Sequence, residues 1–308
     1  MRYATIVPRH DGVPIAAVAL PAGGWVGLDR LAQLSGRLEE LLPALLNPKI
    51  ELASRAAAWT GPRHADDEIC FLPPVVRPPS FRDFYAFEQH VKTARGKRGL
   101  EVPPAWYEIP VFYFSNPNAL VGHDAAVFAP AGCAELDYEL ELGIIIGRGG
   151  RDIPVERAWQ HVGGLTVLND FSARDLQRHE VSVGLGPAKA KDFATAVGPW
   201  LVTLDEFAGR IDGEKLSLEM SARVNGRQLS RGNVATLHHT IPRLIARASR
   251  DAMLLPGDLL GTGTVGTGCI LELGAENTGG WLKPGDVVEL QIEGVGVLRT
   301  PIVSRPAG

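Results

Sequence analysis

A strict alternation of apolar and acidic residues marks the segment from Glu135 to Leu142, which reads ELDYELEL. Successive side chains of a β-strand point to opposite faces, so this pattern predicts a strand with one apolar and one acidic face. Neighbouring carboxylates on the acidic face would lie about 7 Å apart and repel one another. Two interpretations therefore stay open: a strand that binds a hard divalent cation, and a half-solvated edge strand. The acidic residues are Glu135, Asp137, Glu139 and Glu141, and the apolar ones are Leu136, Tyr138, Leu140 and Leu142.

The first 70 residues predict a small unit of their own. Short apolar runs at residues 4–8, 14–20 and 25–28 are separated by Asp-Gly and Gly-Gly turns, which is typical of β-strands. Residues 71–80 include four prolines, which indicate a stiff, extended connector. We therefore predict a small β-rich N-terminal domain at residues 1–74, a connector that continues to about residue 80, and a second domain at residues 75–308.

The second domain begins with a segment that we interpret as a helix from Phe81 to about Arg95, capped by Ser80. On such a helix Asp83 and His90, seven residues apart, would share a face. A short apolar strand at residues 164–168 precedes Asp170, and a further helix is expected after Ser172.

Turn signals dominate the rest of the chain and favour β-structure. Asn225-Gly226 predicts a two-residue hairpin, and apolar runs predict further strands. We therefore expect an α+β fold, a mixed and mostly antiparallel β-sandwich that closes like a roll, with helices packed outside. The expected strands span residues 109–114 and 269–273, and residues 287–293 and 295–303 are expected to form a closing hairpin. The expected helices span 154–161 and 241–248.

Composition and charge narrow the possible classes of protein. Hydrophobic residues make up 45% of the chain, charged residues 21%, and the net charge is −4, as in soluble globular proteins. The basic residues are scattered, and no apolar run approaches the roughly 20 residues needed to cross a bilayer, so neither a nucleic-acid nor a membrane partner is expected. Cys70, Cys133 and Cys269 fit neither a zinc site nor a disulfide framework. We interpret them as small core residues of a cytoplasmic protein.

The glycine-rich stretch from Gly261 to Gly266 matches the dinucleotide fingerprint G-x-G-x-x-G. That fingerprint must open a helix, whereas we predict a strand at residues 269–273, so we reject a dinucleotide site. We interpret the loop as offering backbone N–H groups and Thr264 to a carboxylate or oxyanion, with an ordinary turn as the alternative. A Gly-x-Ser-x-Gly nucleophile elbow does not occur in the sequence.

Five motifs occur in a fixed order, and together they resemble the fumarylacetoacetate hydrolase (fumarylacetoacetase) superfamily. The resemblance covers about residues 75–305 and implies a fumarylacetoacetase-type C-terminal domain. It also implies a divalent metal, a small keto-acid substrate and a homodimer. The motifs are FRDFY with His90 five residues on, LDYELE at 136–141, LNDFSARDLQ at 168–177, GPAKAKDF at 186–193 and GDLLGTGT at 257–264.

The resemblance implies roles for individual residues. Four carboxylates match the family's metal ligands and suit Mg²⁺ first, with Mn²⁺ or Ca²⁺ as alternatives: Asp83, Glu139, Glu141 and Asp170. The catalytic group comprises His90 as the base, Glu272 as the acid that orients it, and Lys191. The residues that match substrate or transition-state contacts are Tyr85, Tyr113, Arg174, Gln177, Gly263 and Thr264.

One departure from the family pattern concerns the substrate. Animal fumarylacetoacetases carry an Arg nine residues after the base, where this chain has Gly99, with Arg95 and Arg98 nearby. We expect the loop at residues 97–107 to shape substrate choice. In the GPAKAKDF motif, Lys189 competes with Lys191 for the lysine role.

By resemblance, the expected activity is hydrolysis of a C–C bond in a β-diketo acid. Such substrates include acylpyruvates and compounds like fumarylacetoacetate or fumarylpyruvate, which arise in the catabolism of aromatic compounds. The same site could instead support 2-keto-4-pentenoate-type hydration, oxaloacetate decarboxylation or 2-oxo acid isomerisation, because all pass through an enolate. A third hypothesis is a dicarboxylate-binding protein without catalysis.

Overall fold

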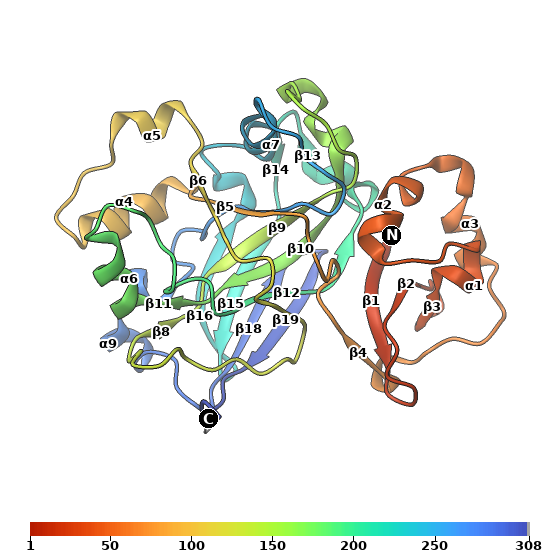
Figure 1. The fold of residues 1–308 in the computed structure, drawn as a ribbon, viewed down its shortest axis with the longest axis horizontal. Helices are drawn as coiled ribbons and strands as arrows, with labels where there is room; N and C mark the ends of the chain where they lie inside the picture. The colour runs from red at the N-terminus through yellow and green to blue at the C-terminus, as the bar shows by residue number, and fades with distance from the viewer. Residues whose placement is uncertain (307–308) are drawn as a thin grey trace.

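The computed structural model describes residues 1–306 and is organised around one large sheet (Figure 1). Among the described strands, neighbours in this sheet are antiparallel except for β17 with β5 and β12 with β7. The prediction of a mixed, mostly antiparallel fold is therefore confirmed, whereas closure into a roll stays a prediction. The strand order is β3 (Trp25–Gly27), β2 (Ile15–Ala19), β1 (Arg2–Pro8), β12 (Thr195–Val202), β10 (Val162–Asp170), β9 (Leu140–Ile146), β17 (Leu259–Gly261), β5 (Phe81–Phe84) and β6 (Phe112–Phe114), with β4 (Ile69–Phe71) on β1 and β7 (Leu120–Val121) on β12.

The N-terminal strands extend this sheet at one edge. Strand β1 pairs with β12, and Tyr3 lies opposite Leu201. Three helices accompany the N-terminal strands at the right of Figure 1: α1 (Leu28–Ala32), α2 (Leu38–Leu45) and α3 (Leu52–Ala57). Backbone hydrogen bonds thus cross the boundary expected at residue 74, although the division itself stays a prediction.

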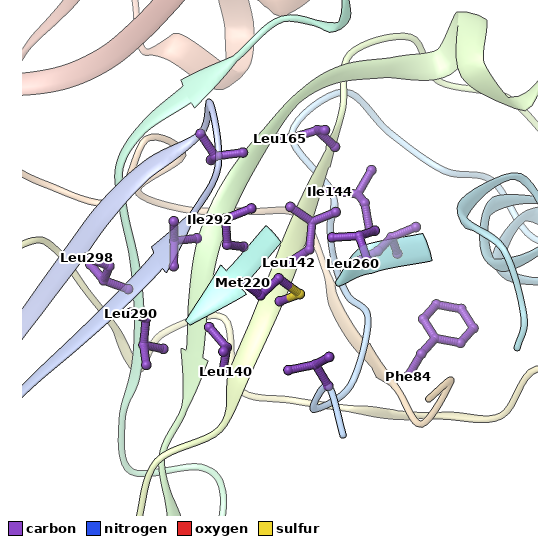
Figure 2. Packing of buried hydrophobic residues seen from close by; sticks show 14 of the residues in the cluster. Phe84, Leu140, Leu142, Ile144, Leu165, Met220, Leu260, Leu290, Ile292 and Leu298 are labelled. Carbon is purple, nitrogen blue, oxygen red and sulfur yellow. The ribbon is translucent and has the colours of Figure 1, made fainter. Parts of the chain in front are cut away.

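A second sheet of four strands packs against one face of the large sheet. Leu140 and Leu142 of β9 share an apolar cluster with Met220 and Leu290 of the small sheet, and Figure 2 shows them lying together. Burial of these side chains is the main favourable contribution to folding. The small sheet has the order β16 (Arg227–Asn233), β15 (Glu219–Val224), β18 (Val287–Ile292) and β19 (Gly296–Pro301), so both predicted hairpins are confirmed.

Short strand pairs and helices complete the rest of the described chain. Strand β8 (Leu136–Asp137) pairs with β11 (Ser172–Ala173), and β13 (Ile211–Asp212) pairs with β14 (Lys215–Leu216). The predicted helix at 241–248 is confirmed as α7 (Ile241–Ser249), and residues Val155–His161 form a 3₁₀-helix. The remaining helices are α4 (Glu88–Gly96), α5 (Pro104–Glu108), α6 (Arg174–Val181), α8 (Ile270–Leu273) and α9 (Ala275–Thr278).

The other face of the large sheet changes from apolar to acidic along its central strands. At one end, side chains of four strands join an apolar cluster with Tyr3 and Leu42 of the N-terminal region. At the other end, the same face carries carboxylates and a glycine, because side chains two apart on a strand share a face. The apolar positions are Phe81, Ile145, Leu168 and Leu259, and the positions that follow on the same face are Asp83, Glu141, Asp170 and Gly261.

Several local predictions are wrong. Residues 81–84 form strand β5 and not the start of a helix, which begins only at Glu88, so Asp83 and His90 do not share a helix face. Ser80 does not cap a helix; its hydroxyl donates to Asp258 at 2.7 Å. Ser172 lies in β11 and also caps no helix, since its hydroxyl donates to the carbonyl of Asp170. Residues 269–273 include helix α8 and not a strand.

The acidic segment is not a half-solvated edge strand, because Asp137, Glu139 and Glu141 are buried and β9 lies between β10 and β17. The three cysteines are free, as expected, but Cys70 is exposed and so is not a core residue. Within residues 1–306, no helix combines the length and the apolar character that a membrane crossing requires.

Candidate active site

The register of five adjacent strands gathers the predicted acids at one place. Asp83 of β5 lies opposite Tyr113 of β6 and also opposite Gly261 of β17. Next to β17 comes β9 with Glu141, and then β10 with Asp170 at its last position. The carboxylates come from three separate segments of the chain, and the sheet alone makes them neighbours.

Three of these carboxylates form a buried cluster. Asp83, Glu141 and Asp170 each offer an oxygen within 4.8 Å of the others, and each side chain is almost inaccessible to solvent. Burial, followed by repulsion from neighbouring carboxylates, raises the pKa of Asp83 and Glu141 well above the usual range. Burial also raises the pKa of Asp170, against the opposing effect of Lys191. One oxygen of Asp83 has no hydrogen-bond partner, so the cluster fits a hard divalent cation.

Glu139, the fourth predicted ligand, forms ion pairs beside this cluster. Its carboxylate contacts Lys191 Nζ at 2.5 Å and Arg174 Nη2 at 2.7 Å. Lys191 also donates to Asp170 at 2.7 Å, so its ammonium group bridges two of the acids. Burial alone would raise the pKa of Glu139, but Lys191 and Arg174 outweigh it and hold the pKa well below its usual range. A metal-ligand role for Glu139 stays a prediction.

Two glycines let the backbone approach the acids closely. A Cβ at Gly261 would lie 2.4 Å from Asp83 Oδ1 and 2.9 Å from Glu141 Oε2, which is closer than real side chains allow. Gly263 has φ of +78°, a conformation that favours glycine, and its N–H donates to Glu141 at 2.9 Å. The loop therefore does donate to a carboxylate, but to one within the protein.

A histidine–glutamate pair borders the same site. His90, in the first turn of α4, places Nδ1 3.1 Å from Oε2 of Glu272 on α8, and both side chains are buried. The ring of Tyr85 meets the His90 ring edge-on, with centroids 5.3 Å apart. These contacts confine the imidazole from two sides, which is what a base of fixed orientation requires.

Asp137 organises the site, although the sequence pattern indicates only that it lies on the acidic face. Its carboxylate accepts from Arg174 Nε at 2.8 Å and from the backbone N–H groups of Ile270 and Leu271 at 2.7 and 3.0 Å. One buried side chain therefore holds the first residue of α6 and the N-terminal end of α8, which carries Glu272. In the sequence, the alternation of acidic residues is the signal that marks Asp137. Its contact with α8 follows from the tendency of helix N-termini to bind carboxylates.

The predicted residues converge on one cavity of about 680 Å³. Its lining includes every predicted site residue except Asp170 and Glu272, which lie behind Lys191 and His90 respectively. Tyr113 donates to Asp170 at 2.5 Å, and Gln177 accepts from Arg174 at 3.0 Å. The lining residues from the prediction are Asp83, Tyr85, His90, Tyr113, Glu139, Glu141, Arg174, Gln177, Lys191, Gly263 and Thr264.

The structure also resolves the competing basic residues. Lys189 is exposed and pairs with Asp192 at 2.7 Å, so Lys191 is the lysine at the cavity. Arg98 lines the cavity together with Lys97, whereas the guanidinium of Arg95 donates to the carbonyl of Glu101.

Comparison with known proteins agrees with this geometry. The model for the C-terminal domain of fumarylacetoacetate (FAA) hydrolase matches residues 80–303. The chain belongs to the fumarylacetoacetate hydrolase family. Fumarylacetoacetase of Arabidopsis thaliana is 32% identical to it over 244 residues, which cover 63% of this chain but only 58% of the plant protein. The resemblance seen in the five motifs is thereby confirmed.

Two solved structures of the family share the whole fold. The 5-carboxymethyl-2-hydroxymuconate delta-isomerase of Mycobacterium smegmatis is 26% identical, with a TM-score of 0.70 and full coverage of both chains. The maleylpyruvate hydrolase of a Sphingobium species, solved with manganese(II) and pyruvate, has a TM-score of 0.74 and covers 99% of this chain and 100% of its own. At 23% identity, this second likeness concerns the fold alone.

Gly261→Ala should weaken metal binding by about 10–100-fold, because the new methyl group displaces Asp83 and Glu141. Titration calorimetry with Mn²⁺ would measure the affinity. Gly209→Ala is the control, since a Cβ there meets nothing within 4 Å. Equal affinity in both variants would show that the two acids do not bind the metal.

Asp137→Asn should lower the free energy of unfolding by about 1.5–3 kcal/mol, because it weakens charge-assisted hydrogen bonds to Arg174 and α8. Urea denaturation would measure the change. Glu135→Gln removes an acid of the same segment whose ion pair with Arg178 is partly exposed, and it should cost less than about 1 kcal/mol. A similar loss of stability in both variants would contradict the conclusion that Asp137 holds Arg174 and the N-terminal end of α8 in place.

Metal affinity should increase with pH, because protons compete for carboxylates whose pKa values are raised. The stability of the metal-free protein should change with pH in the opposite direction to the metal affinity. The folded state binds these protons more tightly than the unfolded state, so the metal-free protein should lose stability as pH rises through the raised pKa values. Mn²⁺ titrations and thermal melts with chelator across neutral pH would measure both trends. An affinity independent of pH would refute the assignment of these ligands.

Proposed function

We propose that the protein hydrolyses a C–C bond in a β-diketo acid of the acylpyruvate type. One observation carries this proposal: a carboxylate cluster, two buried cations and an oriented histidine–glutamate pair all border a single cavity. A cavity of about 680 Å³ lies within the roughly 300–1,000 Å³ that small-molecule sites occupy.

The proposed cofactor is one divalent ion, Mg²⁺ first and Mn²⁺ or Ca²⁺ as alternatives. Asp83, Glu141 and Asp170 would hold it, with Glu139 as the fourth ligand, because an all-oxygen set suits hard cations. When bound, the ion would supply Lewis acidity and positive charge for the oxygens of the substrate. The manganese(II) of the Sphingobium hydrolase structure supports an ion of this class.

His90 is the proposed base. Because Nδ1 lies 3.1 Å from Glu272, the carboxylate favours the tautomer with the proton on Nδ1 and leaves Nε2 free to accept one. His90 lines the cavity, so a water molecule there could give its proton to Nε2 as it attacks the distal carbonyl of the substrate. Glu272 would stabilise the imidazolium that forms.

The cations Lys191 and Arg174 border the cavity and would stabilise the negative charge on the attacked oxygen. When that oxyanion collapses, the C–C bond breaks and its electron pair passes to the leaving carbon as an enolate. Protonation of this carbon by His90 completes the turnover and yields a carboxylic acid and a 2-oxo acid. Each turnover consumes one water molecule, so the atoms of the reaction balance.

Polar groups of the cavity wall favour a substrate with carboxylates at both ends. The hydroxyl of Thr264 is buried without a hydrogen-bond partner, so it is available to bind a carboxylate. Lys97 and Arg98 are exposed at the wall and form no ion pair among residues 1–306. A fumarylpyruvate-like diacid would place one carboxylate at each position, which we propose as the substrate class.

Isomerisation of a 2-oxo acid is the second candidate. It is favoured by the isomerase of Mycobacterium smegmatis, whose fold matches the full length of this chain at 26% identity. Hydration and decarboxylation remain further alternatives on the same site. Hydrolysis alone requires the addition of water and C–C cleavage together, so product analysis separates these reactions.

A panel of acylpyruvates, fumarylpyruvate, fumarylacetoacetate and oxaloacetate, assayed with Mg²⁺, Mn²⁺ and chelator, tests the proposal. Diacids should be split into two products, and chelator should abolish the reaction. His90→Gln should reduce turnover by about 10²–10⁴-fold, the usual contribution of a general base. His179→Gln, at an exposed position of α6, is the control and should leave turnover unchanged. Isomerised or decarboxylated products without hydrolysis would refute the proposal.

A further inference from the structure

A second group of metal-binding side chains lies beside the carboxylate cluster. His90, Cys269 and Glu272 each offer a ligand atom within 4.8 Å of the others. The proposed reaction uses His90 and Glu272 but assigns nothing to Cys269. A buried thiol next to the base and its partner therefore calls for an explanation.

The distances in this group resemble those of a tetrahedral site. Nδ1 of His90 is 3.1 Å from Oε2 of Glu272, and Sγ of Cys269 is 3.7 Å from the same oxygen. With zinc bond lengths of about 2.0–2.1 Å to nitrogen or oxygen and about 2.3 Å to sulfur, ligand atoms of a tetrahedral site lie about 3.3–3.6 Å apart. The two distances that involve Oε2 of Glu272 are close to these values.

The polar atoms of this group lack other partners. Oε1 of Glu272 is buried without a hydrogen-bond partner, and Nδ1 of His90 has only the 3.1 Å contact with Oε2 of Glu272, which is not an aligned hydrogen bond. His90 is 4% exposed and Cys269 is fully buried. Buried polar atoms without partners are unfavourable, and coordination would satisfy both. His90 and Leu271 line the cavity, so an ion can reach the group from there, and so can a water molecule that serves as the fourth ligand.

We infer that His90, Cys269 and Glu272 form a second metal site, selective for thiolate-seeking divalent ions such as Zn²⁺. One thiolate and one carboxylate balance the two charges of the ion, so the occupied site is neutral in its buried surroundings. Burial raises the pKa of the Cys269 thiol, so binding releases its proton to water. The carboxylate cluster offers only oxygen, and the two sites therefore select different ions.

Zinc at this site would inhibit the enzyme. A metal on Nδ1 leaves the proton of the neutral imidazole on Nε2, which then cannot accept a proton from water. Glu272 would at the same time be withdrawn from His90. This inhibition rests on the proposed function, whereas the binding itself does not.

Co²⁺ added to protein saturated with Mg²⁺ tests the binding. Wild-type protein should show a near-ultraviolet charge-transfer band from thiolate to cobalt, and Cys133→Ser should retain it as the control. Cys269→Ser should lose it. No band in wild-type protein, or an equal band in Cys269→Ser, would overturn the inference. If Cys269→Ser does not fold, His90→Gln decides: a lost band supports the site, and an unchanged band overturns it.

Turnover separates this inference from the proposed function. With excess Mg²⁺, Cys269→Ser should need about tenfold or more Zn²⁺ for half-inhibition than wild type and Cys133→Ser. Equal inhibition of all three would show that zinc acts elsewhere. If no substrate of the panel is hydrolysed, the proposed function fails, while the cobalt band still decides the metal site.

Discussion

Buried negative charge is the constraint on which this structure depends. Four acids meet on one face of a sheet where water cannot screen them, and in isolation they would repel one another. Lys191 and Arg174 neutralise the charge around Glu139, but Asp83, Glu141 and Asp170 remain with raised pKa values. These three buried carboxylates favour the binding of a cation, and the sheet holds them in fixed positions around it. Elsewhere the same face is apolar, and its packing against the N-terminal region holds the strands that carry the acids.

Hydrogen bonds of one side chain, Asp137, connect other residues of the site to the acidic segment. Asp137 belongs to the acidic segment, yet its contacts reach Arg174 on α6 and the N-terminal end of α8. Through α8 it also determines where Glu272 lies relative to His90. Asp137 and Glu141, one of the clustered acids, belong to the same segment, so this stretch of chain contributes both to the acid cluster and to the position of the base.

Much of the site was predictable because its signals are local. The alternation of residues 135–142 identified the acids, and the five ordered motifs indicated the family and the lining residues. Glycine and turn signals located both β-hairpins. The errors arose where distant partners outweigh local propensity. Residues 81–84 suit a helix by sequence, but pairing with β17 and β6 makes them a strand. Residues 270–273 look like a strand, but Asp137 caps them as a helix.

The sequence by itself determined which residue types are present and how they alternate, since the period of a strand and the chemistry of a carboxylate are local properties. Only the tertiary structure decided which acids meet, because the register of β5, β17, β9 and β10 depends on pairings between distant segments. The same holds for Cys269. On a strand it would point away from Glu272, three residues on, whereas the turn of α8 that begins directly after Cys269 brings the two side chains together beside His90.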